Sequence, residues 1–275
     1  MNLSMTTDYV TYIRSPQPYL RRIAEAGFTH VHWCHEWNTA HVYSMEEIVQ
    51  IGEWLRQYGL RLLDLHAPHG REQHWGSDSE DGRSASVARI RNRLEMTAHL
   101  AGQAIVLHLP PVPTCVSELP AYWTALRRSM DELLVVSRKT GIRIALENMV
   151  DDDFLALERC LAEYGSDRVG LCYDSGHGNI GQDGLGHLDR HRDRLISVHL
   201  HDNDGKHDQH NVPFTGAVDW PRLAKILAGS SYRDCVSMES NMRGEKIEEA
   251  AFLQEAHQAG ERLTELIARQ GEDCC

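Results

Sequence analysis

The chain has 275 residues, of which 40 are acidic and 28 basic, and its formal net charge is −12. This acidic balance disfavours nonspecific binding to nucleic acid or to anionic membranes, because both need a basic surface. No apolar run approaches the roughly 20 residues of a membrane span, and no basic segment followed by an apolar one marks a secretory signal. None of the seven cysteines forms a Cys-x-x-Cys pair, which favours reduced thiols in a cytoplasmic protein.

Eight short apolar runs, each followed by a helical pattern, alternate along the chain. The first is weak, near Asn2–Met5, and the second, Thr29–Trp33, comes just after a helix end at Gly27. The other strands are expected at Arg61–Leu65, Ala104–Leu107, Ile142–Leu146, Val169–Tyr173, Leu195–Val198 and Cys235–Met238. Apolar residues at three- and four-residue spacing predict helices that include Met45–Tyr58, Ser84–Ala101, Tyr122–Lys139 and Glu245–Arg269.

The repeated strand–helix pattern predicts an α/β fold, a single (β/α)8 barrel over residues 1–275. No linker or change of composition indicates a second domain. The polar, glycine-bounded stretch Gly70–Gly82 is the longest irregular segment before the C-terminal helix, so it is either a mobile lid or an ordinary surface insertion. The tail, residues 270–275, is expected to fray, and the C-terminal helix could support a homodimer.

Ionisable residues follow six successive runs, at the end of the strands where barrel active sites lie. They are His66, His108, Glu147, Asp174, His199 and Glu239. A single histidine at a strand end is usually structural, but a buried glutamate is costly unless its charge is compensated. Six such residues would converge on the barrel mouth, where a divalent cation would relieve the repulsion between carboxylates. The pattern therefore predicts a metal site with mixed imidazole and carboxylate ligands.

Several motifs resemble the xylose isomerase-like barrel superfamily, which includes sugar-phosphate isomerases and epimerases and the endonuclease IV type of zinc nuclease. They are LHAPH at 65–69, IALEN at 144–148, LCYDSGH at 171–177, HLHDNDGKHDQH at 199–210, VDW at 218–220 and MES at 238–240. The resemblance covers nearly the whole chain. It implies a xylose isomerase-like TIM barrel.

The epimerase branch of that superfamily implies one metal ion. Its ligands would be Glu147, Asp174, His199 and Glu239. The resemblance also makes the two glutamates the acid/base pair on opposite faces of a sugar. Carboxylate-rich sites of this kind suit manganese or magnesium, and cobalt is a further candidate.

The endonuclease IV branch implies as many as three ions, and each of its nine ligand positions has a match here. One ion would lie between His66, His108 and Glu147, and another among the four epimerase-type ligands. The third would be held by His177, Asp208 and His210. This imidazole-rich set suits zinc. However, the chain is acidic and has no Arg/Lys-rich loop at the strand ends, and the phrase HDNDGKHDQH is more similar to sugar-phosphate isomerases and epimerases.

The leading functional hypothesis is proton transfer beside a carbonyl in a sugar, keto-sugar or sugar phosphate. A metal would stabilise the enediolate, while Glu147 and Glu239 would remove and return the proton. The same site could instead serve a sugar dehydratase or lyase. Competing hypotheses are a multinuclear zinc phosphodiesterase and a non-catalytic binding barrel; the intact pair of glutamates disfavours the last, and no nucleic acid or membrane partner is expected.

Further side chains are weaker candidates for contacts with a carbohydrate substrate. Trp37 could form an apolar wall, and Lys206 could meet a phosphate or sugar oxygen, although a solvated loop residue is the alternative. Asn148 and Asn241, which follow the two glutamates, could bind substrate hydroxyls. His201 would share a face with His199 and could replace or support it. For three residues near the second strand end, substrate contact and surface placement are both open interpretations. They are His32, His35 and Glu36.

Overall fold

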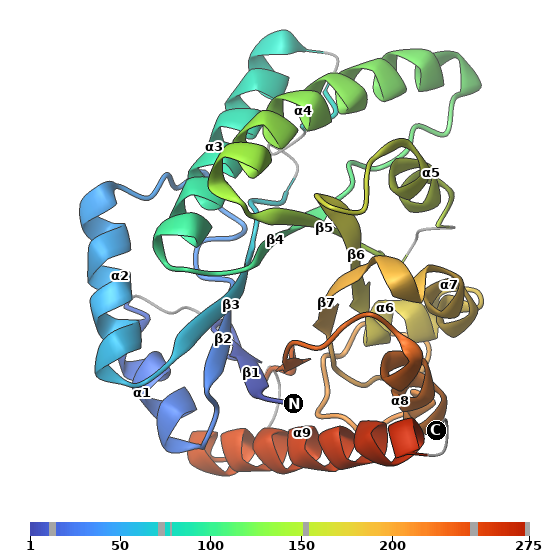
Figure 1. The fold of residues 1–275 in the computed structure, drawn as a ribbon. Helices are drawn as coiled ribbons and strands as arrows, with labels where there is room; N and C mark the ends of the chain where they lie inside the picture. The colour runs from blue at the N-terminus through green and yellow to red at the C-terminus, as the bar shows by residue number, and fades with distance from the viewer. Residues whose placement is uncertain (11–14, 71–74, 78, 151–153, 243–246, 273–275) are drawn as a thin grey trace.

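Eight parallel strands, connected by helices, form a barrel in the computed structural model (Figure 1). The described residues are 1–10, 15–70, 75–77, 79–150, 154–242 and 247–272. The strands are β1 (Leu3–Thr6), β2 (His30–Trp33), β3 (Arg61–His66), β4 (Ala104–His108), β5 (Arg143–Glu147), β6 (Val169–Asp174), β7 (Leu195–His199) and β8 (Val236–Met238). The helices are α1 (Gln17–Glu25), α2 (Met45–Gln57), α3 (Glu80–His99), α4 (Leu119–Thr140), α5 (Leu155–Glu163), α6 (Ser175–Ile180), α7 (Gly184–His191), α8 (Trp220–Gly229) and α9 (Glu249–Glu272), with the 3-10 turns η1 (Val116–Glu118) and η2 (Arg192–Arg194).

The sheet closes on itself between β7 and β8. Its hydrogen-bonded order is β7-β6-β5-β4-β3-β2-β1-β8, and the seam is joined just beyond β7. The Leu200 N–H donates to Ser237 O at 2.9 Å, and the Glu239 N–H donates to Leu200 O at 3.0 Å. This closure confirms the predicted (β/α)8 barrel and brings the ends of β7 and β8 together.

Alternation along each strand decides which side chains enter the barrel. In β5, Ile144 and Leu146 pack in the main apolar core, whereas Ala145 belongs to a separate small cluster with Val106. Glu147 has the same parity as Ala145, so it projects from the interior face at the end of the strand. Register shifts interrupt the alternation between β2 and β3 and between β6 and β7, and the interior residues at the strand ends build the polar mouth.

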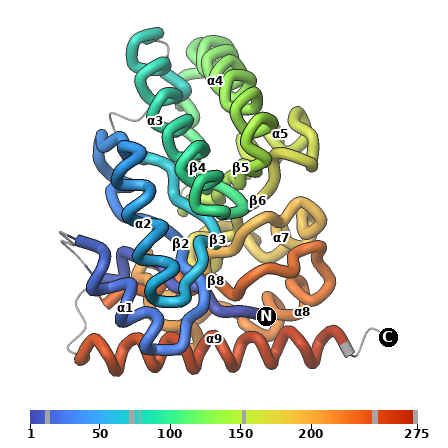
Figure 2. Tube along the Cα trace, turned by 60° about the vertical axis from the view of Figure 1, so that its left-hand side comes forward, coloured from blue at the N-terminus to red at the C-terminus, as the bar shows by residue number. Residues whose placement is uncertain are grey.

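Local capping signals fix the ends of several helices. At the start of α2, the Glu47 N–H donates to Ser44 Oγ at 3.2 Å and the Ser44 N–H donates to Glu47 Oε2 at 2.7 Å, a reciprocal capping box. At the end of α4, Gly141 adopts φ +81°, a left-handed conformation that favours glycine. α3 lies beside α4, and α9 runs along one side of the barrel against α8 (Figures 1 and 2).

The stretch predicted to be irregular, Gly70–Gly82, is shorter than expected. α3 begins at Glu80, four residues before the predicted start, so residues 80–82 are helical despite Gly82. Trp75 is buried and its Nε1–H donates to His108 O at 3.0 Å, which ties this part of the segment to the end of β4. Residues 71–74 and 78 lie outside the described residues, and the lid hypothesis remains a prediction.

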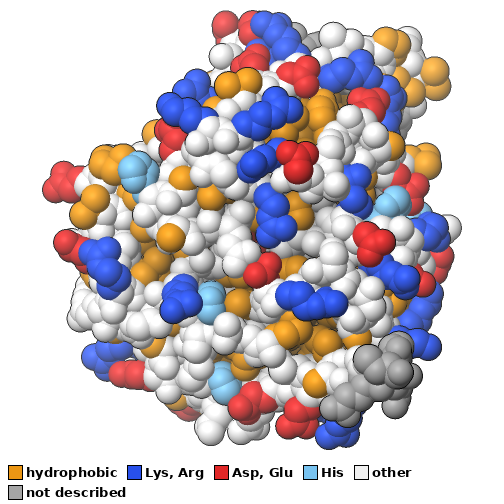
Figure 3. Space-filling view, viewed as in Figure 1, with side chains coloured by type: hydrophobic (Ala, Val, Ile, Leu, Met, Phe, Trp, Pro, Cys, Tyr) orange, Lys and Arg blue, Asp and Glu red, His pale blue; other side chains and the backbone are white. Residues whose placement is uncertain are grey.

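The last helix also differs from its predicted limits. α9 starts at Glu249 and continues to Glu272, so residues 270–272 are helical rather than frayed, and residues 273–275 lie outside the described chain. Within the described residues, no helix is both long and apolar enough to cross a membrane. On the face seen in Figure 3, Lys and Arg side chains are interspersed with Asp and Glu rather than gathered into one stripe.

Candidate metal centre

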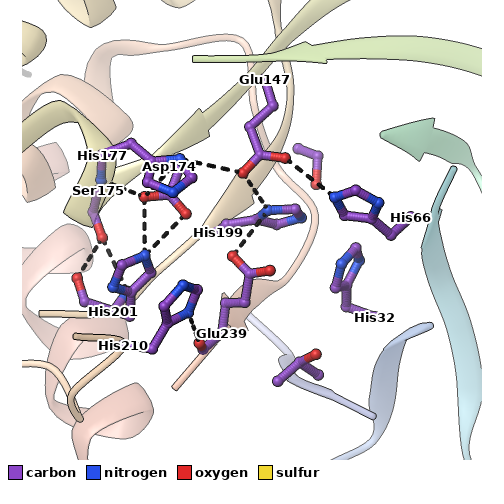
Figure 4. A network of polar contacts seen from close by, with 12 residues as sticks. His32, His66, Glu147, Asp174, Ser175, His177, His199, His201, His210 and Glu239 are labelled. Carbon is purple, nitrogen blue, oxygen red and sulfur yellow. Dashed lines mark hydrogen bonds and ion pairs between the residues drawn. The ribbon is translucent and has the colours of Figure 1, made fainter. Parts of the chain in front are cut away.

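Four strand-end residues form the central group, which comprises Glu147, Asp174, His199 and Glu239. They come from β5, β6, β7 and the residue after β8, and one ligand atom of each lies within 4.8 Å of the others (Figure 4). Parallel pairing explains their meeting, since Asp174 and His199 are register partners and the barrel seam sets Glu239 beside β7. The predicted epimerase-type ligands are thus together at one point.

A single imidazole nitrogen lies between the two glutamates of the central group. His199 Nδ1 is 3.1 Å from Glu147 Oε1 and 3.1 Å from Glu239 Oε2. One N–H cannot donate well to both carboxylates, whereas one divalent cation can accept lone pairs from all three atoms. Oε2 of Glu239 is buried and has no hydrogen bond among the described residues. The donor set therefore fits a divalent metal ion.

The electrostatics of Glu147 agree with a positively charged neighbourhood. Burial alone would raise the pKa of this carboxyl, but the imidazoles of His199 and His108 outweigh it and hold the pKa well below its usual range. Glu147 is accordingly a carboxylate at neutral pH. Its two oxygens face different imidazoles, Oε1 toward His199 and Oε2 toward His108 at 3.0 Å. It is therefore suited to bridge two adjacent ions.

The second predicted set, the histidine flank, consists of His66, His108 and Glu147. His66 donates its Nδ1–H to Ala67 O at 2.7 Å, so its Nε2 is left with the lone pair. That Nε2 lies 3.0 Å from His108 Nε2. Burial and then the neighbouring His108 lower the pKa of His66 well below its usual value, which keeps the imidazole neutral. A neutral, oriented imidazole is what a metal ligand requires.

The third set also forms, and it gains a member that sequence reasoning did not assign to it. The outer cluster contains His177, His201, Asp208 and His210. His177 donates Nδ1–H to Asn148 O at 2.9 Å and His210 donates Nδ1–H to Glu239 O at 2.8 Å. Their Nε2 atoms consequently face Asp208 Oδ2, at 3.5 and 3.3 Å.

Negative potential in the outer cluster favours a positive charge there. Burial would lower the pKa of His177, but Asp174 and Asp208 outweigh it and raise the pKa to about 10. Burial likewise opposes protonation of His210, yet chiefly Asp208 raises its pKa to about 9. A divalent cation bound between the same atoms would balance this negative potential, and neither imidazole would then need to be protonated.

The sequence predicts only that His201 replaces or supports His199. Its Nε2 lies 3.0 Å from the Asp174 carboxylate, and its ring stacks on His210 with centroids 3.9 Å apart. This member of the outer cluster therefore also contacts the central group. The two-residue spacing of His199 and His201 was the available signal in the sequence. That spacing does not show that the second imidazole reaches Asp174 and Asp208.

Asn148, a predicted substrate contact, has its side-chain amide bound within the protein. The side chain is fully buried and clamps the backbone of Asp174, donating Nδ2–H to Asp174 O at 3.0 Å and accepting the Asp174 N–H at 2.9 Å. Asp174 is further fixed because its Oδ1 accepts the His177 N–H at 2.7 Å. The amide beside Glu147 thus positions a central ligand instead of facing the mouth.

The remaining substrate candidates have mixed placements. Trp37 is half-buried with its ring centroid 5.1 Å from that of His66, so it borders the histidine flank. Asn241 is nearly buried and its backbone N–H donates to His210 O at 2.9 Å. Lys206 is exposed on the turn after Gly205. The roles of these three side chains toward substrate remain predictions.

The polar residues at the end of β2 differ in how deeply they are buried. His32, for which surface placement was an alternative, is fully buried, and His35 and Glu36 are half-buried. Two interior residues that sequence reasoning missed, Asp64 and Ser197, lie beneath the central group. Each is a lone polar residue inside an apolar run, which was the only sequence signal for them.

Comparisons with known proteins agree with this architecture. A family model described as a xylose isomerase-like TIM barrel matches residues 20–259. The uncharacterized protein y4fM of Sinorhizobium fredii is 30% identical over 272 residues, covering 90% of this chain and 88% of the relative. A solved D-tagatose 3-epimerase-like protein superposes with a TM-score of 0.80 at 21% identity over 100% of both chains. IOLI protein, solved with a binding zinc atom, has a TM-score of 0.74 at 16% identity and covers 98% of this chain and 99% of its own.

Proposed function

Because the chain belongs to the xylose isomerase-like TIM barrel family, we propose that it is a divalent-metal-dependent isomerase or epimerase of a sugar, keto-sugar or sugar phosphate. One observation carries this proposal: Glu147 and Glu239, from opposite sides of the seam strand β7, lie on either side of His199 Nδ1, each 3.1 Å from it. Two carboxylates beside one cation site are the requirement for proton removal and return. The similarity to a D-tagatose 3-epimerase-like protein supports the same reaction class.

In this proposal the two glutamates move a proton at a carbon next to a carbonyl. One carboxylate removes it and the other returns it, from the opposite face for an epimerisation. Glu147, Asp174, His199 and Glu239 would hold the ion, which when bound neutralises the negative charge that develops on the substrate oxygens. Trp37 would give the substrate an apolar wall beside the histidine flank. Loss of a hydroxyl group instead of proton return would make the same site a lyase.

The histidine flank and the outer cluster favour a second candidate, a multinuclear phosphodiesterase. All nine ligands implied by the endonuclease IV resemblance fall into three adjacent groups. Clustered ions can stabilise both the attacking and the leaving oxygen of a phosphoryl transfer. This chemistry would need the flanking groups, whereas proton transfer needs only the central group.

The two candidates are separated by an assay on the metal-loaded protein. Solvent deuterium uptake is measured with a panel of ketoses and keto-sugars, alongside metal content and cleavage of a duplex that contains an abasic site. We expect uptake into at least one sugar, reduced about 10²- to 10⁴-fold in Glu239→Gln, the range for a lost general acid or base. Glu158→Gln, a change in the α5–α7 ion pairs away from the mouth, is the matched control. Duplex cleavage without exchange into any sugar would replace the isomerase proposal with the phosphodiesterase.

A further inference from the structure

A buried polar chain lies directly beneath the central group. It consists of His32 on β2, Asp64 on β3 and Ser197 on β7, each at most 1% exposed. His32 Nδ1 is 2.7 Å from Asp64 Oδ1, and Ser197 Oγ–H donates to Asp64 Oδ2. Residues 32 and 64 are direct partners in the β2–β3 register. The strands themselves therefore hold the imidazole against the carboxylate.

This chain sets the direction of the His32 ring. With Asp64 as an acceptor, the proton of the imidazole is on Nδ1, and Nε2 points away from the carboxylate with its lone pair. Nε2 is buried, and it has no hydrogen-bond partner among the described residues. Leaving a buried polar atom unpaired is unfavourable to folding. A histidine with a purely structural role would not be expected to leave this nitrogen unpaired.

The His32 imidazole belongs to the neighbourhood of the proposed metal. Ligand atoms of His32, His199 and Glu239 all lie within 4.8 Å of one another. The His32 and His199 ring centroids are 4.3 Å apart, and His32 lies close to both partners in Figure 4. A carboxylate that accepts one ring N–H while the other ring nitrogen faces the ion is the usual support of a metal-bound histidine.

We propose that His32, through Nε2, binds a divalent metal ion at the barrel mouth together with His199 and Glu239, and that Asp64 and Ser197 are its positioning residues. The inference rests on the metal site of the proposed function, but it does not depend on which reaction the site catalyses. This set of two imidazoles and one carboxylate is richer in nitrogen than the four-residue group. Such a set favours zinc or cobalt over magnesium.

The direct test uses the cobalt(II)-loaded full chain and proton NMR. Each metal-bound imidazole contributes a strongly shifted, solvent-exchangeable resonance from its other ring N–H. We expect His32→Gln to lose one such resonance and to bind cobalt at least tenfold more weakly. His30→Gln removes an imidazole from the same strand outside the ligand groups, and it should leave the spectrum and the affinity unchanged. An unaltered spectrum in His32→Gln would overturn the proposal.

Asp64→Asn provides the second test, which keeps the imidazole and disturbs only its support. Loss of a carboxylate that orients a ligand typically weakens metal binding about 10- to 100-fold. We expect that loss in the cobalt dissociation constant, with the shifted His32 resonance retained but displaced. If Asp64→Asn and His32→Gln lower the melting temperature of the metal-free protein but leave cobalt affinity unchanged, the chain is only structural. Deuterium exchange in the wild-type protein tests the reaction separately, so its failure would leave the ligand assignment standing.

Discussion

The central group and the outer cluster contain similar ligands but are built in different ways. Glu147, Asp174 and His199 terminate three neighbouring strands, and their side chains are 0–2% exposed. In the outer cluster, Asp208 and His210 come from the long loop after β7, and their side chains are 36% and 20% exposed. Sheet register thus positions the central ligands, while three of the four outer ligands lie in the chain beyond the end of β7.

The loop owes its shape to one buried aspartate. Asp202 Oδ1 accepts the backbone N–H of Asn203 at 2.9 Å and of Val218 at 3.1 Å, and Oδ2 accepts Trp220 Nε1–H at 2.8 Å. Asp202 also exchanges two backbone hydrogen bonds with Asn211, at 2.8 and 2.9 Å. The barrel therefore supplies the central group, whereas the outer cluster depends on a loop that is held by the hydrogen bonds of Asp202 and can be perturbed through that residue.

The largest effect is expected at Glu147, the residue shared by the central group and the histidine flank. Glu147→Gln removes one of the two proposed acid/base groups and a ligand of two adjacent groups. We expect deuterium exchange to fall by about 10⁴-fold, the upper end for a lost general base and equivalent to about 5.5 kcal/mol. Metal analysis should show fewer ions per chain, with the outer cluster still loaded. Unchanged metal content would contradict the bridging role.

The next effect tests the loop anchor. In Asp202→Asn, the amide can still accept the two backbone N–H groups, but its NH₂ then faces the Trp220 N–H and leaves buried donors unpaired. We expect a loss of about 1–3 kcal/mol in the free energy of unfolding, measured by urea denaturation. Metal binding should weaken at the outer cluster more than at the central group.

A matched surface change gives the baseline for that measurement. Asp167 has a side chain that is 76% exposed, so Asp167→Asn should change the free energy of unfolding by no more than about 0.5 kcal/mol. Equal weakening of metal binding at both groups in Asp202→Asn would show that the loop and the barrel mouth are one cooperative unit. It would contradict the view that the outer cluster can be perturbed without the central group.

The meeting of the central ligands could be predicted from the sequence, but not every contact around them could. The central ligands each follow an apolar run, and parallel strands of a barrel end at one edge, so Asp174 and His199 could be placed together without coordinates. The chain from His32 to Asp64 and Ser197 could not. Asp64 is a single polar residue within LLDL, residues 62–65, and Ser197 lies 133 residues further along the chain, so no local pattern joins them.

The partner of Asn148 could not be predicted from its position in the sequence either. Asn148 follows Glu147 directly, which suggested that it shares the mouth with the glutamate. Alternation turns it away from the mouth, and its amide binds the backbone of Asp174, 26 residues away. The hydrogen-bond partners of Asn148 depend on the register of neighbouring strands and on where α6 begins. Neither can be read from the spacing of residue types in the sequence.

Asp208→Asn probes whether the outer cluster takes part in the reaction. The variant keeps the size of the side chain but removes the charge that faces His177 and His210. We expect the outer ion to bind at least tenfold more weakly, about 1.4 kcal/mol, by competition with a chelator. Deuterium exchange should fall far less than in Glu147→Gln. An equal collapse of exchange would place the outer cluster within the catalytic centre and favour the multinuclear candidate.

The smallest effect concerns the tip of the same loop. Asp204 accepts the N–H groups of Lys206 and His207 at 2.9 Å each, and its bond with the His207 side chain is foremost in lowering its pKa to about 2. This contribution to folding is present above the unfolded pKa of about 3.9 and is lost as the pH falls through the folded value. Carboxyl carbon shifts from NMR should therefore show Asp204 still mostly ionised near pH 3.5, in the presence and absence of metal. An ordinary titration in the metal-free protein alone would mean that the turn forms only when the outer cluster is loaded, and that the loop is shaped by its ion rather than by Asp202.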